Sequence, residues 1–441
     1  MTQYRFWSGL HTIGGNIMEV QTAQARVICD FGLSVGGDTE QIDETLSELE
    51  FLLATNQLPS IPYLYETESF KKIKLASVNE STLKTTLFIS HLHLDHMGGL
   101  QYLPEGTVVY LSEEAYRLYY VLIKVGEENP SKADIRLFDF DTAVQVSDIT
   151  VTPKWSDHDS VGCSAFFIET NELKLIHSGD VRLNGEHPER IIKWANEAKV
   201  WSPDVLLLEG TSFSFDGEKK QASEEPVSEK ELLQKWGELL QDDPDSIILY
   251  NPYIRNVERI KSIAEETELY GRKMVFESAY AEVLHAFYPE KKWRILESDQ
   301  IEVKEYVQEI VTLQDLTQHP SHYVLQNSYK NKETVTYFNK GNYVHSNGEP
   351  LGDYDKRYAE LLCFLEIHQF SFVQMGTSGH ATKEDLLTIA EIVGAKQTIP
   401  WHSFKPVAFQ QRLIANGLAS FIPEINTNYL VKQKTEIGVT E

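Results

Sequence analysis

The stretch ISHLHLDHMGGL, residues 89–100, constrains the fold of this chain more than any other feature. It places four possible metal ligands, His91, His93, Asp95 and His96, within six positions. In an extended loop His91 and His93 point the same way, while Asp95 and His96 can face a second point nearby. One metal ion cannot use all four ligands and keep an open position, whereas two ions can. The stretch therefore predicts a site for two metal ions.

Further ligand-type side chains follow strand-like runs elsewhere in the chain. The run ITVT precedes His158, and the runs LKLIHSGD, DVLLLEG, FSFVQMGTSGH and KQTIPWH end in turn at Asp180, Glu209, His380 and His402. Functional groups collect where the strands of a layered α/β sheet end. The repeated pattern therefore predicts one shared site at a sheet edge.

The middle of the chain has a different character. A charged, polar segment at 216–230 is followed by alternating helices and short strands, among them SIILYNP, RKMVFES, HYVLQN and GNYVHSN. This alternation predicts a smaller α/β unit with its own parallel sheet. Because 441 residues exceed the usual size of one core, we expect a larger domain formed by residues 1–212 and 372–441 and an inserted unit at 213–371. The spacing of leucines also predicts a helix over residues 40–58.

Charge and composition narrow the class of protein. A formal net charge of −26 opposes non-specific binding of long nucleic acid through a broad basic surface, although a local cationic groove stays compatible with it. The three cysteines are far apart and favour a reducing compartment. The first residues lack the apolar segment of a signal peptide, and no apolar run approaches the ~20 residues that span a bilayer. We therefore expect a cytoplasmic protein without a membrane segment.

The motif HLHLDH resembles the signature of the metallo-β-lactamase fold hydrolases. Further positions of that family follow in order, with Asp30 in VICDFG, His158 in SDHD and Asp180 in HSGD. The resemblance implies an α/β fold, a four-layer αββα sandwich with the metal site at one edge. It also implies that Asp30 orients a loop and that Asp180 bridges two metal ions.

The resemblance extends to the β-CASP branch, whose members process nucleic acids. Within that branch the chain is similar to ribonuclease J. Glu209, His380 and His402 fit an acidic position and two late histidines of that branch, and YNPYIRNVERI and RKMVFES look like segments of its inserted cap domain. Two positions depart from the pattern, Ser403-Phe404 in place of Gly-Glu and Asp159 where Ser is common. About 40 residues follow His402, so we expect no C-terminal dimerisation domain like that of ribonuclease J, and the oligomeric state stays open.

The resemblance implies two ligand sets that share one aspartate. The first set is His91, His93, His158 and Asp180, and the second is Asp95, His96, Asp180 and His402. Imidazole-rich ligation with carboxylates favours Zn²⁺, two per chain, with Mn²⁺ as the alternative. A water bridging two such ions is acidified from a pKa of ~15.7 toward ~7, which would supply hydroxide as the nucleophile. Glu209 is expected to accept an N–H from a histidine ligand and so orient that ligand.

His380 is expected to act on the substrate rather than on a metal. A capping box at residues 382–385 and Gly394 predict a helix that starts just after His380, where backbone amides favour anions. There His380 would bind a phosphate oxygen or protonate the leaving group. The expected catalytic residues are Asp95, Asp180 and His380, and the expected phosphate-binding residues are Thr377, Ser378, Gly379 and His380.

These observations favour a metal-dependent ribonuclease that cleaves phosphodiester bonds in a cleft between sandwich and cap. The resemblance implies 5′ to 3′ exonuclease action, endonuclease action or both on single-stranded RNA, with a preference for a 5′-monophosphate. A hydrolase of a small ester, lactone or thioester is the first alternative, and the acidic composition supports it. A non-catalytic subunit that binds RNA or a partner is the second, although every ligand position is filled.

Overall fold

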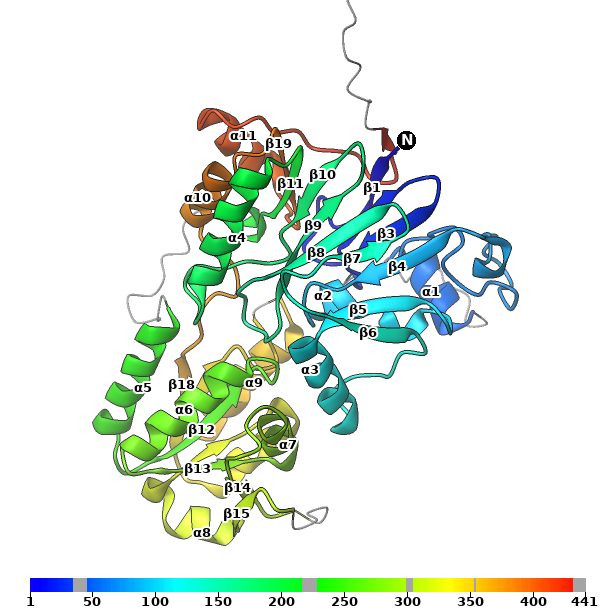
Figure 1. The fold of residues 1–441 in the computed structure, drawn as a ribbon. Helices are drawn as coiled ribbons and strands as arrows, with labels where there is room; N and C mark the ends of the chain where they lie inside the picture. Colours follow the sequence, from blue (N-terminus) through cyan, green and yellow to red (C-terminus); the bar gives the residue numbers. More distant parts are fainter. Residues whose placement is uncertain (35–45, 216–227, 299–303, 353, 431–441) are drawn as a thin grey trace, which may run out of the picture.

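Three β-sheets form two lobes of the molecule (Figure 1). The computed structural model describes residues 1–34, 46–215, 228–298, 304–352 and 354–430. Two of the sheets face each other in the upper lobe of Figure 1, and the third forms the lower lobe. None of the helices in these ranges is long and apolar enough to cross a membrane.

The first sheet of the upper lobe is antiparallel at one side and parallel at the other. Hydrogen bonding runs antiparallel from β20 to β3 and parallel from β3 to β6. Its strands, in spatial order, are β20 (Tyr429–Leu430), β1 (Gln3–Ser8), β2 (Ile17–Gln21), β3 (Ala25–Cys29), β4 (Lys84–Phe88), β5 (Val108–Ser112) and β6 (Asp134–Phe138).

The second sheet combines strands that precede the third sheet in the sequence with one strand that follows it. Its last strand in sequence, β19, pairs in parallel with β11, so residues after the third sheet return to complete this one. In spatial order its strands are β19 (Gln397–Trp401), β11 (Val205–Glu209), β10 (Lys174–His177), β9 (Ser164–Glu169), β8 (Ile149–Trp155) and β7 (Val144–Val146).

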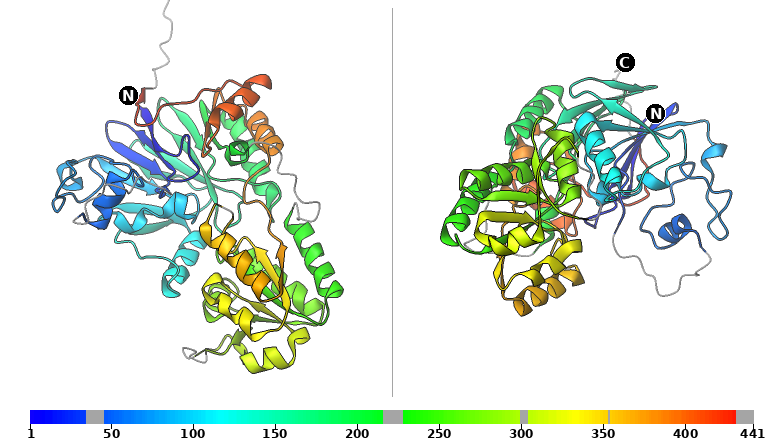
Figure 2. Two further views of the ribbon diagram at one scale, coloured as in Figure 1. Left: turned by 180° about the vertical axis from the view of Figure 1, so that it is seen from behind. Right: turned by 90° about the horizontal axis from the view of Figure 1, so that it is seen from below.

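Apolar side chains between these two sheets form the central core. Phe6, Val27 and Phe88 of the first sheet pack with Phe166 and Leu207 of the second. The outer face of the second sheet is covered by α4 (Pro188–Trp201), α10 (Lys383–Val393) and α11 (Pro406–Ala415). The outer face of the first carries α1 (Glu48–Ala54) and α3 (Glu113–Lys124). The layers therefore run helix, sheet, sheet, helix, and the expected αββα fold class is confirmed (Figure 2).

The third sheet is parallel throughout, as the sequence of the insert predicts. One face carries α5 (Glu229–Asp242), α6 (Val257–Leu269) and α7 (Ser278–Phe287), and the other carries α8 (Leu313–Gln318) and α9 (Lys356–Ile367). In spatial order its strands are β15 (Val307–Val311), β14 (Trp293–Leu296), β13 (Lys273–Phe276), β16 (Tyr323–Gln326), β12 (Ile247–Pro252), β17 (Gly341–Ser346) and β18 (Phe370–Gln374). We call this unit the cap and the upper lobe the sandwich. The division at residues 213 and 371 stays a prediction, and β18 continues past residue 371 to Gln374.

One apolar cluster crosses from the sandwich into the cap. Leu118 and Leu122 of α3 belong to the same buried cluster as Val283 and Leu284 of α7, and these two helices pack together. The two lobes are therefore joined by shared apolar packing as well as by the chain itself.

The helix expected over residues 40–58 is shorter than predicted. Within the described residues α1 begins after Ser47, whose side chain forms a capping box with Glu50, and it ends at Ala54. Asn56 follows with a φ of 56°, a left-handed conformation that an α-helix cannot continue through. Residues 40–45 of the predicted helix lie outside the described ranges.

Candidate metal centre

The histidine-rich loop is held by close backbone packing at the end of β4. His93 is the N-cap of the short helix α2 (Leu94–Met97), which carries Asp95 and His96. The His96 ring lies against the His91 ring, with centroids 4.0 Å apart. The neighbouring strand end packs against this helix at Gly32, where an added Cβ would lie 1.7 Å from the Asp95 carbonyl oxygen. Only glycine leaves room for this approach, so the local sequence fixes where the loop sits.

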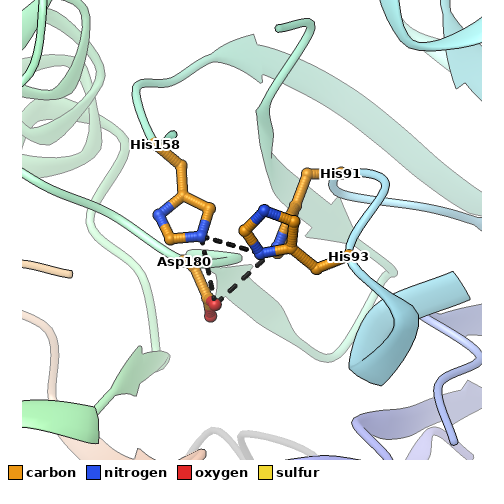
Figure 3. A group of neighbouring side chains, drawn as sticks. All are labelled: His91, His93, His158 and Asp180. Carbon is orange, nitrogen blue, oxygen red and sulfur yellow. Dashed lines mark hydrogen bonds and ion pairs between the residues drawn. The ribbon is translucent and has the colours of Figure 1, made fainter. Parts of the chain in front are cut away.

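The predicted ligands come together in two groups, and the members of each group are those of the two ligand sets that the resemblance implies. One group contains His91, His93, His158 and Asp180, and the other contains Asp95, His96, Asp180 and His402; in each, the ligand atoms all lie within 4.8 Å of one another. Ligands of one Zn²⁺ ion, at bond lengths of about 2.0–2.2 Å, would be separated by up to about 4.4 Å. Small side-chain movements would thus suffice to surround an ion. Figure 3 shows the first group, with the three rings turned toward the carboxylate.

Asp180 lies at the centre of both groups. Its Oδ2 atom is 3.7 Å from His91 Nε2 and from His158 Nε2, on the side of the first group. The same atom is 3.3 Å from His96 Nε2 and 3.1 Å from His402 Nε2, on the side of the second. One carboxylate oxygen therefore faces four histidine nitrogens, a position from which it could bridge two ions.

The inward atoms fit a metal because they lack other partners. His91 Nε2, both carboxylate oxygens of Asp180 and His402 Nε2 are buried and have no hydrogen-bond partner among the residues that the structure describes. Leaving a buried polar atom unsatisfied costs roughly 1–3 kcal/mol, and more if it is charged. Divalent ions would satisfy all of these atoms at once, and the donor set of imidazoles and carboxylates suits Zn²⁺ or Mn²⁺.

Burial lowers the pKa values of the histidines at the site, and the neighbouring carboxylates raise them. Burial, reinforced by neighbouring histidines, lowers the pKa of His91 well below its ordinary value. Burial also lowers the pKa of His158, to about 3. For His402 the effect of burial is outweighed by Asp180 and Asp95, which raise its pKa to about 10. A cation placed among these groups would replace protons on the second-group histidines, so metal binding there releases protons.

Two residues at the site adopt left-handed backbone conformations. Asp30 has a φ of 61° and His402 a φ of 50°, which are uncommon for residues other than glycine. The Asp30 carboxylate accepts hydrogen bonds from the backbone N–H of Ser90, at 2.7 Å, and from its hydroxyl, at 2.9 Å. It also lies 2.7 Å from His96 Nδ1. Asp30 thus ties the end of β3 to the histidine-rich loop.

His380 lies outside both ligand groups, with its ring centroid 5.0 Å from that of His158 and 5.6 Å from that of His402. Its Nδ1 atom is 3.2 Å from Glu209 Oε1 and 3.7 Å from Asp180 Oδ2. The effect of burial on its pKa is outweighed by the Glu209 carboxylate, so the pKa of His380 is raised. Glu209 therefore contacts His380 rather than one of the histidine ligands. The helix expected after His380 is confirmed, with a capping box of Thr382 and Asp385 and with Gly394 at its C-cap.

The loop before His380 differs from a simple phosphate-binding turn. The Thr377 hydroxyl donates to Glu229 at 3.0 Å and accepts from Arg259 at 2.7 Å, so it is not free to bind a phosphate. The Ser378 hydroxyl accepts from the backbone N–H of His380 at 3.1 Å and donates to the His380 carbonyl at 2.9 Å. The Thr377 side chain is also buried, whereas Ser378 is exposed. The predicted phosphate role therefore does not extend to the Thr377 hydroxyl, and it stays a prediction for Ser378, Gly379 and His380.

Sequence reasoning missed several residues that contact the site. Asp159, noted only as a departure from a family pattern, has its Oδ1 atom 3.1 Å from His93 Nε2 and 3.3 Å from His158 Nε2. Its position directly after a ligand histidine was the available signal. Tyr253 of the cap lies against His93, with ring centroids 5.3 Å apart, and no motif marked it.

The sandwich with its two groups of histidines and carboxylates resembles a metallo-hydrolase domain of the metallo-β-lactamase type. Residues 84–249 match the sequence model of the metallo-beta-lactamase superfamily. The whole chain is similar to a crystal structure of a protein of unknown function from Enterococcus faecalis V583, with a TM-score of 0.83, 26% identity and coverage of 97% of this chain and 99% of that one.

Among curated proteins the chain is similar to a ribonuclease and to a subunit of a cleavage and polyadenylation factor. It is 23% identical to ribonuclease J of Mycoplasma genitalium over 270 residues, which are 60% of this chain and 42% of the relative. It is 26% identical over 146 residues to cleavage and polyadenylation specificity factor subunit 3-I of Arabidopsis thaliana, or 29% of this chain and 20% of that protein. The expected resemblance to the β-CASP branch is confirmed, and the matched region spans less than half the length of these relatives.

Proposed function

We propose that this protein is a metal-dependent nuclease that cleaves phosphodiester bonds of single-stranded RNA. The observation that carries the proposal is the position of Asp180, whose Oδ2 atom faces nitrogens of both ligand groups. A shared carboxylate of this kind suits two-ion catalysis of phosphoryl transfer. The similarity to ribonuclease J and to a polyadenylation factor subunit supports RNA as the substrate class.

When bound, two divalent ions would acidify a water molecule and neutralise the charge that builds on a phosphoryl oxygen. The residues of this chain have separate tasks around that chemistry. His158 is oriented by a hydrogen bond from Nδ1 to the carbonyl of Gly379, which leaves its Nε2 lone pair directed inward. Gly379 is required for this contact, because an added Cβ there would lie 2.9 Å from Asp159 and from the His158 ring.

His380 is suited to donate a proton to the leaving oxygen. Its raised pKa increases the protonated fraction near neutral pH, and Glu209 holds Nδ1 so that Nε2 is left for the substrate. After donation, the neutral ring is reprotonated from solvent, since its side chain remains 23% exposed. The buried Glu209 carboxylate thus positions the acid rather than taking part directly.

The test is to incubate metal-loaded protein with 5′-labelled and 3′-labelled single-stranded RNA and DNA, with Zn²⁺ or Mn²⁺ supplied. We expect shortening of the RNA and at least a ~10²-fold slower rate for Asp180→Asn. The matched control is Asp139→Asn, at an exposed aspartate that belongs to neither ligand group. Turnover of a small ester or lactone without cleavage of either nucleic acid would replace this proposal with the small-molecule alternative.

A further inference from the structure

The two predicted metal positions differ in the contacts that their histidines make through the ring nitrogen that faces away from the ion. A histidine that binds a metal through one ring nitrogen is oriented by what the other nitrogen contacts, and such a contact with a carboxylate also makes the ring more basic. The contacts of the outer nitrogens therefore show how firmly the histidines of each position are oriented for a metal ion. We call the group of His91, His93, His158 and Asp180 the first site and the other group the second site.

Every histidine of the first site has an outer contact. His91 Nδ1 lies 3.0 Å from the Ser90 hydroxyl, which itself donates to Asp30 and can therefore accept from the imidazole. His158 Nδ1 contacts the Gly379 carbonyl. His93 Nδ1 lies 3.1 Å from His158 Nε2, on the ligand side, and His93 Nε2 lies 3.1 Å from the carboxylate of Asp159.

The second site is held less completely. His96 Nδ1 has a carboxylate partner, Asp30, at 2.7 Å. His402 uses Nε2 to face Asp95 and Asp180, and its buried Nδ1 has no hydrogen-bond partner within the described part of the chain. The Asp95 side chain is also the most open of the second-site ligands, at 26% exposed. Fewer ligands of the second site are therefore oriented by contacts with other side chains.

Asp159 is the contact that most distinguishes the first site. It lies in the loop after β8, and its Oδ1 atom is buried and has no hydrogen-bond partner among the described residues. A buried carboxylate oxygen that faces a histidine nitrogen but accepts no hydrogen bond is costly. With an ion on the His93 Nδ1 side, the ring must carry its proton on Nε2, which then faces Asp159. The burial of Asp159 is explained if it fixes that tautomer.

We infer that Asp159 is a positioning residue for His93 and that it makes the first site the tighter of the two, so that metal loads there first. This inference rests on the proposed metal centre. Asp159 lies outside the two groups of mutually close ligand atoms. Its Oδ1 atom is 3.1 Å from His93 Nε2, the nitrogen left over when Nδ1 binds an ion, and 3.3 Å from His158 Nε2. Its loss should weaken the first site and leave the second unchanged.

The test is a stepwise titration of metal-free, full-length protein with Co²⁺ and Zn²⁺, followed by calorimetry, by chelator competition and by the visible absorption of Co²⁺. The wild-type protein should bind two ions in separate steps, the first at least tenfold tighter than the second. Asp159→Ala should weaken the first step by about 10–100-fold, the usual range for loss of such an outer contact, and change the spectrum of the first equivalent of Co²⁺. The second step should stay within about twofold.

Asp159→Asn serves as the isosteric variant, because its amide oxygen can still accept from His93 but carries no charge. It should fall between wild type and Asp159→Ala, and it decides the question if the alanine variant does not fold. Asp139→Asn, at an exposed position, is the control and should titrate as wild type does. Equal steps in the wild type, or a first step unchanged in both Asp159 variants, would overturn the inference. A wild-type protein that binds no metal would instead contradict the proposed metal centre itself.

Discussion

The guanidinium of Arg259 and the carboxylate of Glu229 form a buried ion pair, with Nη2 and Oε1 2.6 Å apart, between the α6 helix and the start of α5 in the cap. Arg182, two residues after the shared ligand Asp180, reaches the same carboxylate oxygen at 2.8 Å. The Thr377 hydroxyl completes the cluster from the segment that leads to His380. Residues of the cap and the sandwich thus meet in one polar cluster next to the metal centre.

Removing the central carboxylate should destabilise the whole protein. Glu229→Gln leaves two buried guanidinium groups with a neutral partner, and breaking a buried ion pair costs about 3–5 kcal/mol of unfolding free energy. Denaturant unfolding followed by circular dichroism measures this loss. The control is Glu113→Gln, which breaks an exposed pair with Arg117 on α3 and should change stability by less than about 0.5 kcal/mol. Equal losses in the two variants would mean that the cluster is not important for stability.

The same carboxylate should give the protein a specific sensitivity to acid. Burial raises the pKa of Glu229, but Arg259 and Arg182 outweigh it and lower the pKa from 4.5 to about 2. The unfolded chain then binds a proton more readily than the folded protein, so stability is full above pH 4.5 and falls as the pH drops toward 2. The contribution at stake is about 3 kcal/mol. Urea unfolding between pH 6 and pH 3 should show a steeper loss in wild type than in Glu229→Gln, and parallel curves would contradict this assignment.

Protein purified without chelator should contain close to two divalent ions per chain, because two ligand groups share Asp180. His402→Ala removes a ligand of the second site alone and should lower the content to about one. Elemental analysis after reconstitution and desalting measures both values. A wild-type content below one ion would reject the two-ion model.

Asp95→Asn should separate catalysis from folding. The Asp95 carbonyl accepts the backbone N–H of Asn16 at 2.8 Å, and this contact survives the substitution. The carboxylate, which faces His402 Nε2 at 3.2 Å, is lost as a charged ligand. We expect unchanged thermal unfolding of the metal-free protein and at least a ~10²-fold loss of nuclease turnover. An active variant would show that the second site is dispensable, and an unfolded one would make the residue structural.

The 5′ end of the RNA should matter for the rate. If the loop at Ser378 and Gly379 holds a terminal phosphate beside His380, then 5′-monophosphate RNA should be degraded at least tenfold faster than 5′-triphosphate RNA, a difference of roughly 1.4 kcal/mol. Ser378→Ala should narrow that gap, and His380→Ala should slow both substrates equally. Time courses on matched RNAs provide the measurement. Equal rates with products of mixed length from the first time point would indicate an endonuclease without a pocket for the terminal phosphate.

The grouping of the expected metal ligands could be predicted from the sequence because these residues follow strands. Once β4, β10 and β19 are recognised, their ends meet at one edge, and His91, Asp180 and His402 are brought together by the sheets themselves. The same reasoning predicted the parallel sheet of the cap, whose strands are short apolar runs between helices.

The polar cluster around Glu229 could not be predicted in this way. Its members come from four segments, and nothing in the local sequence shows that Arg182 and Arg259 will share one carboxylate. The hydrogen bonds of the Thr377 hydroxyl depend on that cluster. Nothing near Thr377 in the sequence therefore showed that the hydroxyl would be engaged and not available to a phosphate. Similarly, the length of α1 was set by a capping box and a left-handed residue rather than by the leucine spacing that suggested a longer helix.

The shared apolar packing between α3 and α7 bears on how this architecture could be altered. A unit inserted through two crossings of the chain resembles a module that could be deleted or exchanged. Here, removing the cap would expose Leu118 and Leu122 of α3 to water, which creates an apolar patch prone to association. A grafted cap would need a matching face on its own α7. The boundary between the two lobes is thus a packing constraint that the sandwich and the cap must satisfy together when either is redesigned.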